Sequence, residues 1–143
     1  MAIMSGHGSA LTFGTTSTFS PSFTSLGGLE VSRESLDTSG LATAGARTQI
    51  GGDLYTVSPM THTYLLDPST LASGGANSID DLLFDSSAVS ASEEVTITLA
   101  NSEASTIAGD AHITGFAMED LATDQLIAAT ITLQFDAYPT ITE

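Results

Sequence analysis

The chain has 143 residues, which fits a single domain with a substantial buried core, and 41% of them are hydrophobic, which excludes disorder of the whole chain. Its 17 acidic residues against two arginines and no lysine give a formal net charge of −15, which excludes attraction to a phosphate backbone as a binding force. The absence of cysteine excludes disulfides and thiolate metal sites.

The first 28 residues are rich in Gly, Ser, Thr and Phe and predict an N-terminal arm with a short strand at 11–16. The arm has no signal-peptide pattern, and no apolar run in the chain approaches the ~18 residues of a membrane helix, so we expect no membrane partner. An isolated arm would expose its aromatic rings to water. We therefore expect these rings to anchor the arm at a subunit interface, with packing on the chain's own core as the alternative: Phe13, Phe19 and Phe23.

Residues 28–59 predict two strands joined by a long loop, and both arginines lie here. The first strand spans 29–37, the loop 38–53, and the second strand begins at Leu54 and continues to residue 67. Hairpin loops usually hold about two to five residues, so a loop of this length indicates a contact surface. Alternation along the first strand places its polar side chains on one face: Glu30, Ser32 and Glu34. Within the second strand, Pro59 cannot donate to a ladder, which places it at an edge, a bulge or a strand start.

The rest of the chain predicts one short helix and three strands. Residues 79–84 form the helix, capped by Asn77 or Ser78. Strands are expected at 94–99, 105–119 and 126–137, with bends or bulges at Gly109 and Gly115 in the second of them. Alternation in the last strand predicts one buried face, formed by Ile127, Ile131, Leu133 and Phe135.

No motif in the chain carries recognisable chemistry. The stretch GLATAGART at 40–48 resembles a phosphate loop, but Ala46 stands where the lysine belongs. The three histidines are scattered singly, and alternation at most lets His62 and His112 share a sheet face. The adjacent carboxylates at 80–81 and 93–94 point in different directions. We therefore predict that the protein is not an enzyme and has no catalytic, cofactor-binding or metal site.

The order of these elements resembles the major tail tube proteins of long non-contractile-tailed bacteriophages. The resemblance spans nearly the whole chain, and its most specific part is LDTSGLATAGARTQIGGDL at 36–54, which is similar to the family pattern D-T-x-x-L…G-x-R-T-x-I-P-G-D-L. Gly51 stands where that pattern has proline. Related tube subunits occur in contractile tails, secretion tubes and gene transfer agents, so the resemblance leaves the particle type open.

The resemblance implies a mainly β domain spanning 1–143, a β-sandwich or split barrel with one short flanking helix. Six copies would form a ring whose inner strands join into one barrel, and the rings would stack into a tube. The implied partners are further copies of the chain, the tape-measure protein, tail terminator and distal tail proteins, and double-stranded DNA that passes without specific binding. The implied location is the virion, after assembly in the host cytoplasm.

Two hypotheses assign residues within that picture. Glu30, Ser32 and Glu34 would line the bore, where carboxylates repel DNA, although an acidic surface from a saline habitat also explains the charge. Contacts between rings or subunits would use the loop and the aromatic residues of the arm: Arg47, Thr48, Ile50, Asp53, Phe13, Phe19 and Phe23. We expect Arg47 to pair with an acidic group across an interface, with a weak exposed pair as the alternative.

Two other functions remain open from the sequence. One is a stand-alone acidic β-sandwich that serves as a surface or adhesion module. The other is a hydrolase that uses an unrecognised carboxylate pair, which would need two carboxylates about 5–9 Å apart in a pocket.

Overall fold

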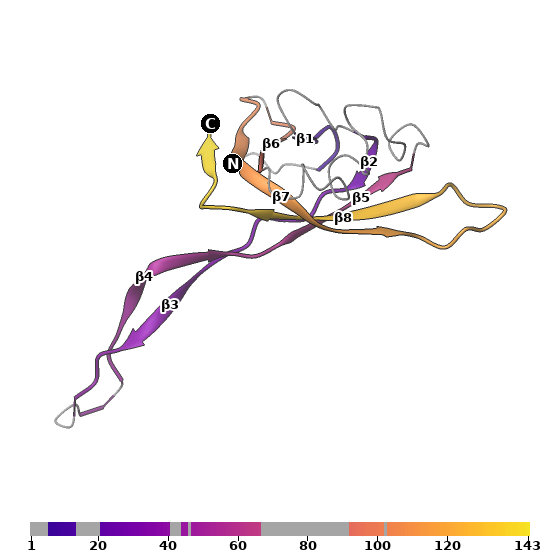
Figure 1. The fold of residues 1–143 in the computed structure, drawn as a ribbon. Helices are drawn as coiled ribbons and strands as arrows, with labels where there is room; N and C mark the ends of the chain where they lie inside the picture. The colour runs from indigo at the N-terminus through magenta and orange to yellow at the C-terminus, as the bar shows by residue number, and fades with distance from the viewer. Residues whose placement is uncertain (1–5, 14–20, 41–43, 46, 67–91, 102) are drawn as a thin grey trace.

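A computed structural model describes residues 6–13, 21–40, 44–45, 47–66, 92–101 and 103–143, and within them the chain is mainly β, with no helix. Seven strands form one curled sheet in the order β1-β6-β7-β8-β5-β2, with β9 also paired to β7 (Figure 1). Two further strands, β3 and β4, form a separate antiparallel pair that projects away from the sheet. The bounds are β1 Ala10–Phe13, β2 Phe23–Ser25, β3 Val31–Asp37, β4 Gln49–Val57, β5 Met60–Leu65, β6 Glu93–Thr98, β7 Thr106–Met118, β8 Ala128–Phe135 and β9 Thr140–Thr142.

The core lies on one face of the curled sheet, because apolar residues alternate with polar ones along the central strands. In β8 every second residue is buried, from Ala129 to Phe135, as the sequence predicts. The neighbouring strands contribute the rest of this face: Leu11, Phe13, Met60, Tyr64, Val95, Ile97, Ala111 and Ile113. Ile127 differs from the expectation, since it lies in the turn before β8 and is 40% exposed.

The expected second strand is divided in two. The chain leaves the ladder at Ser58 and Pro59, so β4 pairs with β3 while β5 pairs with β8 in the sheet. β4 also begins at Gln49, inside the expected loop, so the connection between the paired strands spans residues 38–48. A predicted irregularity near Gly115 is confirmed by a register shift between Ile113 and Gly115.

The described parts of the first 28 residues belong to the sheet. β1 pairs with β6, and Phe13 is only 2% exposed, which assigns it to the core of its own chain instead of an interface. Phe23 is half-buried in β2, where its ring lies edge-on to His62 and Tyr64. Packing on the chain's own core, the alternative considered for the arm, therefore holds for these two rings. Phe19 and the expected helix at 79–84 lie outside the described residues.

No helix in the described ranges is long and apolar enough to span a bilayer.

Candidate assembly surface

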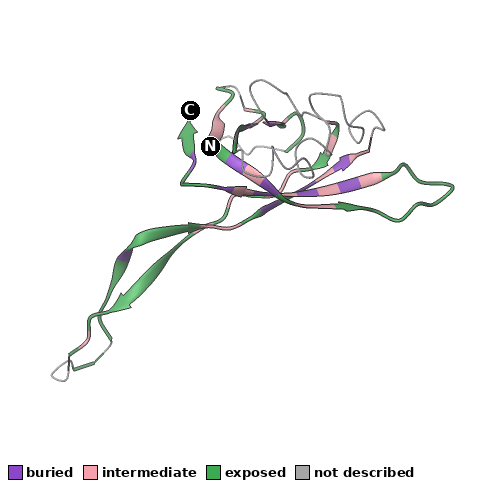
Figure 2. Ribbon diagram, viewed as in Figure 1, coloured by how far each residue is buried: buried purple, intermediate pink, exposed green. Residues whose placement is uncertain are grey.

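The projecting hairpin, formed by β3, β4 and the connection at 38–48, is exposed along most of its two strands (Figure 2). Its pairing runs from Val31 opposite Val57 to Asp37 opposite Gln49. Ile50 lies directly opposite Leu36, and these two apolar side chains are 56% and 44% exposed. A two-stranded hairpin is marginally stable by itself in water, and this one contributes little to the core. The exposed apolar pair therefore makes the hairpin a candidate surface for contact with another molecule.

A bulge interrupts the hairpin midway along its paired strands. Between the pairs Arg33–Tyr55 and Ser35–Gly51, residues 52–54 of β4 stand opposite the single residue Glu34. The Arg33 side chain spans this bulge: Nε donates to the carbonyl of Gly52, and Nη2 donates to the carbonyl of Gly51 over 3.3 Å. Both carbonyls lie where the regular ladder is interrupted, so Arg33 supplies donors that the opposite strand does not.

Arg33 also contacts an aromatic ring. Its Nη1 donates to the Tyr55 hydroxyl over 3.3 Å, and its guanidinium carbon lies 5.3 Å from the centre of the Tyr55 ring. The absence of a side chain at Gly51 makes room for this arrangement, since a Cβ there would lie 2.7 to 3.0 Å from guanidinium atoms. Gly51, which stands where the resembling family has proline, thus leaves the room that the Arg33 side chain occupies.

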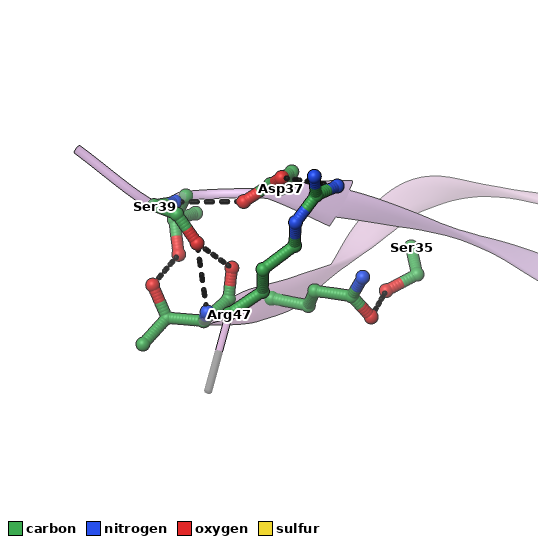
Figure 3. A network of polar contacts seen from close by, with 7 residues as sticks. Ser35, Asp37, Ser39 and Arg47 are labelled. Carbon is green, nitrogen blue, oxygen red and sulfur yellow. Dashed lines mark hydrogen bonds and ion pairs between the residues drawn. The ribbon is translucent and has the colours of Figure 1, made fainter. Parts of the chain in front are cut away.

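Near the end of the hairpin, a polar network surrounds Asp37 (Figure 3). The Ser39 N–H donates to Oδ1 of Asp37 over 2.8 Å, and this hydrogen bond lowers the pKa of that carboxyl. Nη1 of Arg47 lies 3.6 Å from Oδ2 of the same residue, in an exposed ion pair. Thr48 closes the network by donating its N–H to the Ser39 hydroxyl over 2.9 Å. Within the chain Arg47 therefore pairs with Asp37, and a partner across an interface stays a prediction.

The residues predicted for contacts are divided between the projecting hairpin and the sheet, and those predicted for the bore lie on the hairpin or just before it. Arg47, Thr48, Ile50 and Asp53 all lie on the projecting hairpin and are exposed, whereas Phe13 and Phe23 lie in the sheet. Glu30, Ser32 and Glu34 are also exposed, just before and within β3.

Ser32 and Glu34 lie on the side of the hairpin away from the core. Val57 packs against the core cluster and stands opposite Val31, so alternation places Ser32 on the other side, with Glu34 two residues further along β3. The face of the curled sheet away from its core is also polar, and it carries the hydroxyl groups of six threonines and one amide: Thr61, Thr63, Thr96, Thr98, Thr130, Thr132 and Gln134. Both arginines of the chain lie on the hairpin, so the sheet itself carries no lysine or arginine.

His62 and His112 lie on opposite faces of the sheet, so the shared face that alternation at most allowed is not formed. His62 is fully buried opposite Ile131, and its burial lowers its pKa to about 4. His112 stands opposite Gln134 and lies 2.7 Å from Asp136. Hydrogen bonds from the Ser92 hydroxyl and with His112 lower the pKa of Asp136. Among the described residues, no three His, Asp or Glu side chains are grouped as a metal site would need.

A hollow of about 380 Å³ lies beside β2. Its apolar lining comes from Phe23, Leu26 and Leu29 together with Ile97, Leu99 and Ile107. The remaining residues around it are glycine, serine and threonine, so its lining supplies no acid or base.

No protein-family model and no curated protein matches the chain. Solved structures do match over nearly its whole length. One is the sheath/tube terminator structure of an extracellular contractile injection system, PVC, in the extended state (TM-score 0.77, 14% identity, covering 100% of this chain and 99% of that one). Another is the tail of an empty GTA particle (TM-score 0.71, 11% identity, 99% and 100%). A third is the SPP1 tail tube (TM-score 0.64, 14% identity, 98% and 79%).

The chain has a tail-tube fold. The similar structures are components of tails and injection systems, not enzymes. Contractile injection systems and GTA tails share this tail-tube fold, so it is wider than the non-contractile family that the sequence resembles. The expectation of a mainly β chain with a tail-tube fold is confirmed.

Proposed function

We propose that this protein is a structural virion protein, the tube subunit of a long non-contractile phage tail or of a related gene-transfer-agent tail. The observation that carries the proposal is the agreement with tail-tube structures over 98–100% of the chain. In this proposal six copies form a ring, and rings stack into a tube. An exposed hairpin that its own chain leaves uncovered supports the need for neighbouring copies.

The proposed bore is polar and acidic. Glu30, Ser32 and Glu34 line it together with the threonine-rich face of the sheet, and DNA and the tape-measure protein pass through. Support comes from alternation along β3, which puts Ser32 and Glu34 on the side opposite Arg33, and from the absence of lysine and arginine on the sheet. A wall of hydroxyl groups and carboxylates offers phosphate no cation, so a duplex would slide without binding.

The projecting hairpin is the proposed contact between rings. It presents Ile50 and Leu36 as an apolar pair, with Arg47, Thr48 and Asp53 nearby on the same element. Tail terminator and distal tail proteins would meet the two ends of the tube. Assembly would take place in the host cytoplasm, and the finished tube would belong to the virion.

Sizing chromatography with light scattering, followed by negative-stain electron microscopy, tests the proposal. We expect hollow tubes or rings with six-fold class averages. Ile50→Asp should weaken stacking, because it places a charge in the apolar pair, while Thr142→Asp serves as a matched control at an exposed position outside the hairpin. A parent protein that stays monomeric at high concentration would contradict the proposal and favour a stand-alone module.

A further inference from the structure

Arg33 is a positive charge with no carboxylate partner in the part of the chain that the structure describes. Its three hydrogen-bond acceptors, the Gly51 and Gly52 carbonyls and the Tyr55 hydroxyl, are all neutral. The other arginine of the chain, Arg47, already lies beside Asp37. A guanidinium has five N–H donors, so Arg33 is held in place and still has donors left for a carboxylate.

One aromatic ring lies against this charge, and a second ring lies beside the first. The Tyr55 ring lies against the Arg33 guanidinium, and the Tyr138 ring lies 5.9 Å from the Tyr55 ring, centre to centre. Both tyrosines remain more than half exposed. Arginine and tyrosine are enriched at the centres of protein interfaces, where they dominate binding energy. We call Arg33, Tyr55 and Tyr138 the Arg33 cluster.

The turn between β7 and β8, residues 119–127, has the complementary character. It carries three carboxylates and no cation, namely Glu119, Asp120 and Asp124. It also exposes Leu121 and Leu126, which are 66% and 78% accessible. We call this segment the acidic turn. It extends from the sheet on the side away from the projecting hairpin (Figure 1), so it does not reach the Arg33 cluster of its own chain.

We infer that the acidic turn of one copy docks onto the Arg33 cluster of a second copy. A turn carboxylate pairs with the guanidinium, and the leucines cover the tyrosine rings. The contact is head to tail, because it joins two different surfaces, and such contacts propagate into rings or filaments. This inference rests on the proposed self-assembly and names the two surfaces that meet.

Introduced cysteines test the contact directly, since the chain has none of its own. Tyr138→Cys combined with Leu121→Cys should give a ladder of disulfide-linked oligomers on a non-reducing gel. Each single variant can give dimers at most, and Thr61→Cys with Leu121→Cys serves as the control pair. If the parent protein forms tubes in the microscope but the first cysteine pair gives no ladder, the inference is overturned and the proposed function stands. If the parent protein never assembles, both the proposed function and this contact are contradicted.

Charge reversal gives an independent test. Arg33→Glu should raise the concentration needed for polymerisation at least about tenfold, because it sets like charges against each other. Reversal of the turn, with Glu119→Lys, Asp120→Lys and Asp124→Lys, should do the same while leaving the hairpin intact. An equimolar mixture of the two variants should polymerise again, since each then finds a complementary surface on the other. Thr142→Glu is the control, since it adds a carboxylate at an exposed position outside both the hairpin and the acidic turn. Unimpaired polymerisation of either variant, or failure of two folded variants to restore each other, overturns the inference.

Discussion

The backbone N–H of Gly27 donates a hydrogen bond of 3.0 Å to Nδ1 of His62, a side chain that is fully buried in the sheet. Because Nδ1 accepts this bond, the neutral ring carries its proton on Nε2. The bond ties the segment after β2 to β5 and depends on the histidine staying uncharged. Both partners therefore lead to predictions about stability.

Acid should destabilise the protein through His62. Burial lowers its pKa from 6.5 to about 4, so between these values the unfolded chain binds a proton that the folded chain does not. The free energy of unfolding should therefore fall as the pH drops below about 6.5 and level off below about 4, by up to ~3 kcal/mol in total. Urea unfolding at pH 7 and pH 4.5 measures this difference.

His62→Asn supplies the control for that experiment, because its side-chain oxygen can accept the Gly27 bond without titrating. It should reduce the pH dependence, while His112→Gln, at a half-exposed position, should leave most of it. An undiminished pH dependence in His62→Asn would assign the acid response to other groups.

Gly27→Ala should destabilise the fold by about 1–3 kcal/mol. A Cβ at Gly27 would lie 2.4 Å from the carbonyl oxygen of Thr61 and 3.0 Å from its nitrogen, and backbone atoms cannot move aside as side chains do. Gly28→Ala is the matched control, since a Cβ there meets no atom within 4 Å. Thermal melts of the two variants should differ, and equal melting temperatures would contradict the close approach.

Leu133→Ala should cost about 2–5 kcal/mol, because Leu133 is fully buried in the core face of β8. The same substitution at Leu54, which is 83% exposed in the bulge of the hairpin, should leave the free energy of unfolding nearly unchanged. Denaturant titrations of the pair measure the contrast. A large loss at Leu54 would mean that the hairpin is buried by the chain's own residues.

Gly51→Ala should weaken polymerisation without lowering the melting temperature of the subunit. The new Cβ would displace the Arg33 guanidinium, which is the movable end of a long side chain, so the sheet is not strained. Gly40→Ala adds the same group where no atom lies within 4 Å. Pelleting assays over a concentration series compare the polymerisation of the two variants. Identical curves would mean that the position of the Arg33 side chain does not matter for assembly.

Reversing the charge of the proposed bore should make tubes retain DNA. Glu30→Lys with Glu34→Lys places cations where the proposal has DNA pass, and binding of a short duplex should appear at low salt and vanish as salt rises. Glu143→Lys gives a cation at another exposed position as the control. Equal retention by both variants would place Glu30 and Glu34 outside the bore.

The strands of the sheet could be predicted where hydrophobic alternation is visible within one segment of the sequence. β6, β7 and β8 alternate strictly enough that sequence alone places them within a few residues and identifies Ile131, Leu133 and Phe135 as core. β2 and β9 have three residues each, too few for a periodicity. They form because a partner strand offers free hydrogen-bonding groups, which is a property of the folded sheet.

The hairpin was predictable as a surface but not in its geometry. Gly, Ala and Thr around 38–53 predict a loop, and yet residues 49–51 pair with residues 35–37 of β3. The place of Arg33 could not be read from the sequence, since it depends on a bulge that pairing creates. The adjacent glycines at 51 and 52 inside a strand were the available signal.

Strand pairing in this molecule joins segments at very different distances along the chain. β3–β4 and β7–β8 pair near neighbours, whereas β1 reaches across to β6, with Leu11 opposite Ile97. Closing a short segment loses less chain entropy than closing a long one, so local hairpins form early and distant pairs form late. The projecting hairpin needs little of the core and pairs locally. A newly made chain would thus display its projecting hairpin before its body has closed.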